Sequence, residues 1–507
     1  MNYHLNHRFK EMLYQLPVGE NCNHGMAPVA VAGKQDPDLQ FRIRPSITIP
    51  GKLILFVIGL MMAAVGSTHA QKTSFRSTTQ LRERISINQG WKFYRYGPTE
   101  KADSLIYDVR PEIEAKRDDG PADAKPTEAV MVAAAKTALK PWILPTGNDF
   151  IADTTKRYKR PEGHPGIGFP FTRGDFNDGG WDNIDLPHDW AIKGPFYKGE
   201  GVPVGGGMGR LPIQGVAWYR RTIDIQAADK GKNIFLEVDG AMSYAMVWLN
   251  GNLVGGWPYG YSSWRVDLTP YIIPGGKNQL AIRVDNPLNS SRWYPGGGIY
   301  RNVWLTKTNP VNVGQWGTFI TTGNISKQAA KVDIKVNVTN HSGKAGNFIV
   351  STEIYQLDKN GHKVGQSVAS TGPLKILIMA NANGIIPGSV QINHPKLWGP
   401  LPAQTPNRYA ALTRVSLNGI SLDIIETAFG IRELRFDPEK GIFINGQRVV
   451  VNGVNQHHDL GALGAAFNER AAERQLEMLR EMGCNAIRMS HNPPAPELLD
   501  LTDRMGF

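Results

Sequence analysis

Two short polar clusters contain the side chains whose types and spacing could do chemistry. The first reads "NQHHD" and supplies Asn455, His457, His458 and Asp459. The second reads "RMSHN" and supplies Arg488, His491 and Asn492. Imidazole, amide, guanidinium and carboxylate groups together donate and accept hydrogen bonds. The two clusters can therefore bind and orient a polyhydroxylated ligand.

A metal site is the alternative for the same side chains. His457, His458, Asp459 and His491 are of types that ligate metal ions. Successive residues of a strand point to opposite faces, so the two adjacent histidines cannot easily bind one ion. We therefore predict no metal ligands in this chain.

The first cluster is expected at the end of a strand that a helix follows. The segment "GIFINGQRVVVNGVNQHHD" predicts a hairpin that turns at Asn445-Gly446 and leads into a buried strand. In "NERAAERQLEMLREMG", Asn468 can cap a helix and Gly483 can end it. The apolar face of this helix is predicted to consist of Ala472, Leu476, Leu479 and Met482.

The second cluster repeats this arrangement. "NAIRMSH" predicts a strand, and "APELLDLTDRMG" predicts a helix that starts near Ala495 or Pro496 and ends at Gly506. Strand–helix–strand–helix is the start of a parallel α/β domain. We therefore expect residues 431–507 to form the first two βα units of a (β/α)8 TIM barrel. Residues that end the strands of such a barrel line its active-site mouth, so both polar clusters should lie there.

Two all-β domains are expected before the barrel segment. Residues 71–310 show short strands and tight turns, including the hairpin signal Asn250-Gly251, and predict a jelly-roll β-sandwich. Residues 311–430 contain evenly spaced strands, such as the alternating "KVDIKVNVTN", and predict an immunoglobulin-like β-sandwich. A polar insertion at 98–170 interrupts the first domain. A loop of that length is expected to serve function or to be partly disordered.

Tryptophan is dense between Trp181 and Trp316. Most of these rings are expected in the sandwich core, but aromatic rings can also stack on the C–H faces of sugars. The aromatic residues in Gly/Ser-rich loops are predicted to be the more exposed ones: Trp257, Tyr259, Tyr261, Trp293 and Tyr294.

The composition is that of a globular protein with several cores. Hydrophobic residues make up 41% and charged residues 20% of the 507 residues, and this length suggests about three domains. A formal net charge of +11 would allow an acidic partner. However, the densest basic cluster, Lys156–Gly163, has no nucleic-acid-binding motif around it. We therefore predict no nucleic-acid partner.

A secretory signal peptide is predicted at residues 51–70, "GKLILFVIGLMMAAVGSTHA", with cleavage after Ala70. Residues 1–50 are then a non-native extension from a start codon placed too early. An uncleaved signal-anchor is the alternative, although the apolar run is short for a bilayer span. Cleavage would leave Cys484 as the single cysteine and exclude a disulfide framework. We expect an exported protein, periplasmic or extracellular, without a stable membrane anchor.

Long motifs of this chain resemble glycoside hydrolase family 2, and in particular the β-galactosidases of Bacteroides-type bacteria. In chain order they are "DFNDGGWDNIDLPHDWAI", "GVAWYRRTI", "LNGNLVGGWPYGYSSWRVDLTPYI", "SRWYPGGGIYRNVWL", "LWGPLPAQTPNRY", "FGIR" and "NAIRMSHNPPAPELLDLTDRMGF". The resemblance covers about residues 80–507. It implies a jelly-roll sugar-binding domain, an immunoglobulin-like domain and a catalytic TIM barrel.

The resemblance also implies site residues. His457 and His491 match the family's substrate-binding histidines, and Arg488 matches an arginine that supports the site. Asn492 stands where many members have tyrosine. Asp459, which comes from the first polar cluster and not from the resemblance, completes the predicted substrate-binding set. The loop Ser290–Trp293 corresponds to a segment that reaches the sugar pocket in some galactosidases. Arg292 falls there at a position where an acidic residue is expected.

The implied reaction is retaining exo-hydrolysis of a β-glycoside through a covalent glycosyl-enzyme. Such hydrolysis needs two carboxyl groups flanking the scissile bond, and the family's two glutamates are expected beyond Phe507. No catalytic residue is therefore predicted in this chain, and the 507-residue polypeptide is expected to be inactive. Mg²⁺ or Na⁺ are candidate cofactors of the full-length enzyme only, and a homo-oligomer is an open alternative for it.

Three other functions remain alternatives. β-Glucuronidase and β-mannosidase belong to the same family and share its scaffold, so the sugar of the substrate is open. A non-catalytic carbohydrate-binding protein is the alternative from a different class, with the tryptophan-rich sandwich as its functional module.

Overall fold

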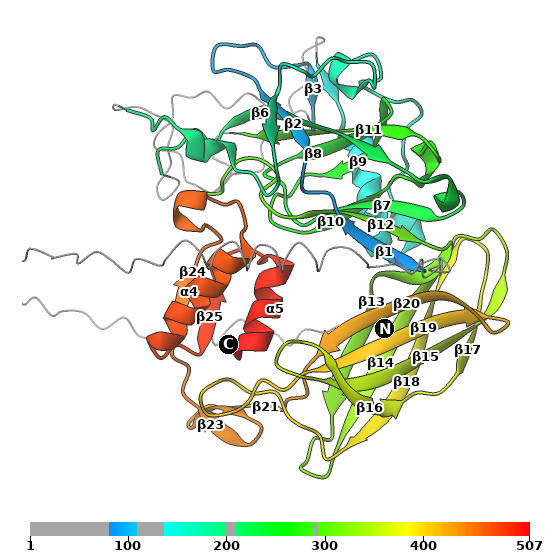
Figure 1. Ribbon diagram of the computed structural model, residues 1–507, viewed down its shortest axis with the longest axis vertical. Coiled ribbons are helices and arrows are strands. Elements are labelled where there is room, and N and C mark those ends of the chain that lie inside the picture. The colour runs from blue at the N-terminus through cyan, green and yellow to red at the C-terminus, as the bar shows by residue number, and fades with distance from the viewer. Residues whose placement is uncertain (1–80, 109–135, 199–208, 288–292) are drawn as a thin grey trace, which may run out of the picture. The chain divides into compact units, whose positions relative to one another are not determined.

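The computed structural model describes residues 81–108, 136–198, 209–287 and 293–507 (Figure 1). The predicted extension at 1–50 and the predicted signal peptide at 51–70 lie outside the described residues. So do most residues of the loop Ser290–Trp293.

The first all-β unit is a sandwich of two antiparallel sheets. One sheet has the order β1 (Arg82–Ser86), β12 (Val303–Thr308), β7 (Asn233–Val238), β10 (Trp264–Asp267). The other has the order β5 (Asp182–Ile184), β2 (Trp91–Arg95), β6 (Gly215–Asp224), β11 (Lys277–Asn286), β8 (Ala245–Leu249), β9 (Asn252–Trp257). Their inner faces bury a core that includes Leu236, Val247 and Ile282.

The predicted hairpin at Asn250-Gly251 is confirmed. Leu249 pairs with Asn252, which leaves a two-residue turn with φ of 51° at Asn250 and 82° at Gly251. Asparagine and glycine tolerate positive φ better than other residues. Short 3-10 turns join other strands at Trp190–Lys193 (η4), Ala227–Asp229 and Thr269–Tyr271.

The described part of the insertion at 98–170 forms short elements that pack on the first sandwich. Its described part forms β3 (Leu105–Ile106), β4 (Thr137–Ala138), α3 (Lys140–Ile143) and 3-10 turns at Leu144–Phe150 and Thr154–Lys156. Its apolar residues Leu105, Leu139 and Ile143 are buried with Trp218 and Trp248 of the six-stranded sheet. The insertion therefore covers the outer face of that sheet, because this face is itself too apolar to meet water.

A second sandwich follows, confirming an immunoglobulin-like fold (Figure 1). Its first sheet contains β13 (Val311–Gly323), β14 (Ala329–Asn340) and β18 (Ala382–Asn393). Its second sheet contains β16 (Lys363–Ser370), β15 (Gly346–Leu357), β19 (Tyr409–Leu417) and β20 (Ile420–Phe429), with β17 (Leu374–Ile378) also paired to β15. Alternate residues of β14, from Val332 to Val338, are buried as predicted.

The last segment begins with a small antiparallel sheet of β21 (Leu434–Asp437), β22 (Gly441–Ile444) and β23 (Gln447–Val449). The strands β24 (Gly453–Gln456) and β25 (Ala486–Met489) then pair in parallel. The helices α4 (Glu469–Glu481) and α5 (Pro496–Met505) follow one strand each (Figure 1). The predicted start of a TIM barrel is confirmed.

The helix ends are also as predicted. The side chain of Asn468 accepts a hydrogen bond from the Ala471 amide, and Gly483 and Gly506 take positive φ of 85° and 75°.

Two predicted details of this segment were wrong. Met482 is 73% exposed, because the helix ends at Glu481 and this side chain turns away from the core. The strand β24 is not buried, because within the described residues it pairs only with β25 and Asn455 faces outward.

The C-terminus of α5 is bound by the second sandwich. The Trp398 indole donates a 2.8 Å hydrogen bond to the Asp503 carbonyl, and the Leu401 amide donates one of 3.1 Å to the Gly506 carbonyl. Arg480 of α4 donates to the Met505 carbonyl. These contacts satisfy carbonyls that the helix itself leaves without partners.

Candidate functional site

The two polar clusters lie together, as the parallel pairing of β24 and β25 requires. His457 follows β24 and His491 follows β25, and their ring centroids are 5.9 Å apart. The indole of Trp293, from the first sandwich, lies 5.7 Å from His457 and 5.4 Å from His491, measured between ring centroids. The three rings form a cluster that we call the aromatic triad.

Arg488 orients His491. Its Nη2 lies 3.0 Å from Nδ1 of His491, and its Nη1 donates to Ser490 Oγ at 3.0 Å and to Asn455 Oδ1 at 3.3 Å. A guanidinium can only donate, so Nδ1 of His491 must accept. The proton of the neutral imidazole then sits on Nε2, which makes His491 a hydrogen-bond donor to a ligand.

Several buried polar atoms at this site have no hydrogen-bond partner among the described residues. They are Nδ1 of His457, Oδ1 of Asn492 and Oε1 of Gln456. Buried polar atoms are normally paired in folded proteins, so unpaired ones call for an explanation. A polyhydroxylated ligand or water molecules could supply the missing partners.

His458 supports the site from behind rather than facing a ligand. Its Nε2 lies 3.1 Å from the Pro295 carbonyl, and its Nδ1 lies 3.5 Å from Nδ2 of Asn492. Burial lowers its pKa to about 4, so the ring is neutral at physiological pH. Its neighbours are Tyr261 and Tyr300, which also explains why Tyr261 is buried, contrary to the predicted exposure.

Asp459 and Asn492 are less accessible than Arg488 and His491. Asn492 is 7% exposed. Asp459 is half-buried. The pKa of Tyr294 is raised, first by burial, then by Asp189, and last by the charge of Asp459. Arg488 and His491 are both exposed. The structure thus brings all five predicted substrate-binding residues to one region, where Arg488 and His491 are exposed and His457 is half-buried.

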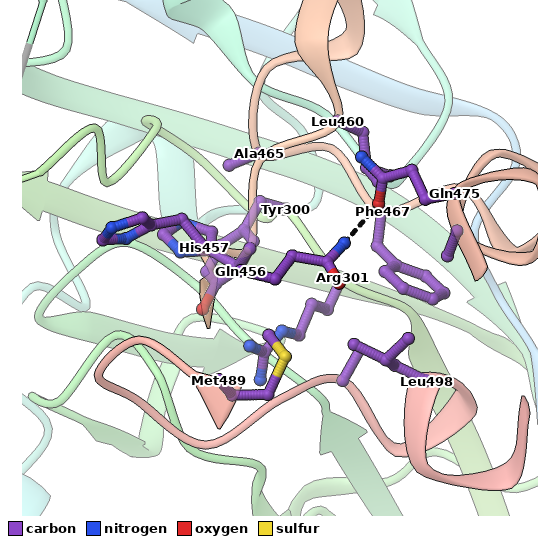
Figure 2. A pocket seen from close by; sticks show the side chains of 13 residues that line it. Tyr300, Arg301, Gln456, His457, Leu460, Ala465, Phe467, Gln475, Met489 and Leu498 are labelled. Atoms are coloured by element: carbon purple, nitrogen blue, oxygen red, sulfur yellow. Dashed lines mark hydrogen bonds between the residues drawn. The ribbon is translucent and has the colours of Figure 1, made fainter. Parts of the chain in front are cut away.

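A small cavity lies beside His457, between the first sandwich and the two helices (Figure 2). It measures about 20 Å³, which is room for about one water molecule. Figure 2 shows Gln456 and Gln475 meeting at its edge, where Nε2 of Gln456 donates to Oε1 of Gln475 at 2.5 Å. A sugar ring cannot enter this cavity.

The first sandwich holds the segment that carries His491. Arg301, 1% exposed, donates from Nη2 to the Pro493 carbonyl at 2.8 Å and from Nη1 to the Pro494 carbonyl at 3.3 Å. Nδ2 of Asn302 donates to Oε1 of Glu497 at 2.5 Å. Glu497 is therefore engaged at this contact and does not face the aromatic triad.

No three histidine, cysteine, aspartate or glutamate side chains gather as a metal site within the described part of the chain. The rings of His457 and His458 contact different neighbours, in keeping with their predicted opposite directions. Mg²⁺ and Na⁺ stay expectations for the full-length protein.

The resemblance placed the loop Ser290–Trp293 at the sugar pocket, but the contacts of Trp293 with the two histidine rings were not predicted, and Arg301 was not singled out. Trp293 belongs to a different fold unit and precedes His457 by many strands. Its position in a Gly/Ser-rich loop predicted an exposed ring but did not tell which side chains this ring would contact.

Three family models match this chain. "Glycosyl hydrolase 2 galactose-binding domain-like" matches residues 213–294, "Glycosyl hydrolases family 2" matches 317–432, and "Glycosyl hydrolases family 2, TIM barrel domain" matches 438–507. The chain belongs to glycoside hydrolase family 2. Its jelly-roll, immunoglobulin-like and partial TIM-barrel units follow the order of that family.

Relatives of this family 2 chain include enzymes of different specificity. It is 44% identical to the β-galactosidase BoGH2A of Bacteroides ovatus over 345 residues, which cover 68% of this chain and 39% of the relative. It is 34% identical to a putative β-glucuronidase of Formosa agariphila over 338 residues, covering 66% and 31%. The chain thus spans well under half the length of these relatives.

A solved structure agrees with this assignment. The structure of a family 2 member from Bacteroides cellulosilyticus matches with a TM-score of 0.61 and 28% identity, over 84% of this chain and 46% of that one. No helix in the described part of this family 2 chain has the length and apolar character needed to cross a membrane.

Proposed function

We propose that this chain forms the sugar-binding side of a retaining β-glycosidase of the β-galactosidase type, which removes terminal β-linked sugars from glycans. The observation that carries the proposal is the aromatic triad, in which His457 and His491 meet Trp293 at the carboxyl ends of two parallel strands. Barrel active sites are built at this end of the strands.

The chemistry of the triad suits a pyranose ring. The Trp293 face can stack on the C–H groups of a sugar. The Nε2 proton of His491 can be donated to a hydroxyl group, and Nδ1 of His457 lacks a partner among the described residues. Each sugar hydroxyl both donates and accepts, so one hydroxyl pair can satisfy both histidines.

In the proposed reaction these histidines bind the sugar while two glutamates do the bond chemistry. One glutamate attacks the anomeric carbon and the other protonates the leaving oxygen, then activates water. We expect both glutamates on later strands of the barrel. Reading the coding sequence past codon 507 tests this arrangement directly.

The specificity proposal favours galactosides because BoGH2A is named a β-galactosidase and is 44% identical. The glucuronidase relatives keep β-glucuronides as the main rival, and the β-mannosides of the same family remain a second one. We further propose that the protein is exported, so that the mature chain begins at Gln71, which N-terminal sequencing of the secreted protein tests.

The central experiment measures binding to the 507-residue chain. The probes are methyl β-D-galactoside, methyl β-D-glucuronide and methyl β-D-mannoside, titrated by isothermal calorimetry. We expect the galactoside to bind most tightly. His457→Ala and His491→Ala should each weaken its binding by about tenfold, which corresponds to about 1.4 kcal/mol.

His362→Ala is the matched control. His362 is 77% exposed in its side chain and lies in the second sandwich, away from the triad. The substitution His362→Ala should leave the dissociation constant of methyl β-D-galactoside unchanged. Tightest binding of the glucuronide would replace the sugar assignment, whereas equal effects of all three substitutions would refute the assignment of the site.

A further inference from the structure

A buried carboxylate outside the predicted site connects three segments that surround it. Asp189 lies at the start of the short turn η4 in the first sandwich and is 1% exposed. Its Oδ1 accepts hydrogen bonds from the amides of Ala191 and Gly297, each at 3.0 Å. Its Oδ2 accepts from the Tyr294 hydroxyl at 2.6 Å and from the Ala465 amide at 2.9 Å.

These partners lie next to the residues that would bind the sugar. Tyr294 directly follows Trp293 of the aromatic triad. Ala465 lies in the loop that follows His457 and His458, just after the turn Gly461–Leu463. A single carboxyl group therefore ties the Trp293 loop of the sandwich to the histidine loop of the barrel.

The backbone around the carboxylate is built for close approach. A Cβ on Gly464 would lie 2.3 Å from Oδ2 of Asp189, and one on Gly296 would lie 2.9 Å from the same atom. Both glycines have positive φ, 59° and 72°. A larger residue at either position would push the two loops away from Asp189.

Both carboxylate oxygens of Asp189 must accept hydrogen bonds to hold the two loops. All four hydrogen bonds described here come from neutral donors, three of them backbone amides. An asparagine of the same size would place an NH₂ group against at least one amide N–H, which cannot accept. Losing a hydrogen bond in a buried site while leaving its partner unpaired is costly.

We propose that Asp189 is a positioning residue of the sugar site: it fixes Trp293 against His457 and His491 and thereby sets sugar affinity without touching the sugar. This inference rests on the proposed function for its effect on binding. Its structural part, the placement of Trp293, stands independently of any ligand.

The test compares Asp189→Asn and Tyr294→Phe with the unsubstituted 507-residue chain. The first readout is the indole ¹⁵N–¹H resonance of Trp293 in the unliganded protein, assigned by its disappearance in Trp293→Phe. We expect both variants to shift this resonance, with Asp189→Asn having the larger effect because it disturbs two loops. The second readout is the dissociation constant of methyl β-D-galactoside, which Asp189→Asn should raise about tenfold.

Asp229→Asn is the matched control. Asp229 is also a buried aspartate of the first sandwich, 4% exposed, but it pairs with Lys232 and Lys307. Its substitution should lower the melting temperature yet leave the Trp293 resonance and the dissociation constant unchanged. If Asp189 had only a structural role, Asp189→Asn would likewise lower the melting temperature and leave the Trp293 resonance and the dissociation constant unchanged.

The outcomes separate the two proposals. An unchanged Trp293 resonance in both Asp189→Asn and Tyr294→Phe overturns the positioning role, whatever the sugar data show. A shifted resonance in a protein that binds none of the three glycosides refutes the proposed sugar site and leaves the positioning of Trp293 standing. If Asp189→Asn fails to fold, Tyr294→Phe alone decides.

Discussion

At the scale of single residues, the site depends on which ring nitrogens carry protons. Arg488 forces Nδ1 of His491 to accept, so the donor that faces a ligand is Nε2. His458 uses both ring nitrogens within the protein. The two adjacent histidines, His457 and His458, therefore have different roles although the sequence presents them as a pair.

Replacing Arg488 by methionine should remove the constraint on the tautomer of His491. In Arg488→Met, Nδ1 of His491 loses its donor, so both neutral tautomers become populated. The ¹⁵N shifts of the His491 ring should show a single Nε2–H tautomer in the unsubstituted chain and a mixture in the variant. Galactoside binding should weaken about threefold to tenfold, which is about 0.7–1.4 kcal/mol.

Arg435→Met is the control for this change, because Arg435 is an exposed arginine that pairs with Asp437 in β21. It should alter neither the His491 shifts nor sugar binding. A mixture of tautomers already present in the unsubstituted chain would contradict the role given to Arg488.

At the scale of elements, the insertion acts as a third layer of the first sandwich. The Phe169 ring stacks on Trp218 with centroids 5.3 Å apart. Asp103, with a fully buried side chain, accepts hydrogen bonds from Arg283 at 3.0 Å and from Trp218 at 2.9 Å. This buried ion pair and the surrounding rings fix the layer to the sheet.

Ile143→Ala tests whether the insertion belongs to the core. Ile143 is 1% exposed, so its truncation should lower the free energy of unfolding by about 2–4 kcal/mol. Ile167→Ala is the matched control within the same insertion, since Ile167 is 56% exposed and should change stability by less than about 0.5 kcal/mol. Equal urea midpoints for the two variants would mean that the insertion is not packed as described.

The insertion also shows where sequence reasoning ended. The strands of the second sandwich and the caps of α4 were predictable because they follow periodic patterns and local hydrogen-bonding rules. The segment "LKPWILPTG" has no period of 2 or 3.6, so its burial depends on the apolar outer face of a sheet distant in sequence. Asp189 and the ring contacts of Trp293 escaped prediction for the same reason, since their partners are fixed only by the packing of separate units.

The pairing of His457 with His491 was accessible from the sequence. Both residues follow predicted parallel strands, and adjacent parallel strands present their ends at the same edge. Burial of β24 was wrongly predicted because an apolar run alone does not tell how many neighbours a strand has.

At the scale of the whole molecule, a buried carboxylate links stability to pH where the first sandwich meets α5. Asp239 is 4% exposed and accepts a 2.7 Å hydrogen bond from the Trp304 indole. Burial raises its pKa to about 6, and the charges of Glu497 and Glu237 add to this, while Trp304 and Arg84 oppose it. The folded chain thus binds this proton more tightly than the unfolded chain does.

The sign of the effect follows from that difference. Folding raises the pKa of Asp239 from 3.8 to about 6. Its contribution to the free energy of unfolding is therefore complete below pH 3.8 and is lost as pH rises through 6. Buried His188 and His458, with pKa lowered to about 4, act in the opposite direction. Only a comparison with a variant isolates Asp239.

Asp239→Asn should gain stability relative to the unsubstituted chain as pH rises from 4 to 7. The gain is at most about 3 kcal/mol, from a shift of about two pKa units. Calorimetric melting temperatures of both proteins at pH 4, 5, 6 and 7 measure it. Curves that stay parallel over this range would show that Asp239 titrates alike in the folded and unfolded chains.

The bound C-terminus of α5 also has a consequence for the order of events during synthesis. Domains form in turn as the chain emerges from the ribosome, the N-terminal ones first. Arg301, Trp398 and Leu401, which hold the segment from Pro493 to Gly506, are all translated before it. We therefore expect α5 to dock onto two finished surfaces, so that the nascent barrel starts its assembly on a scaffold instead of nucleating alone.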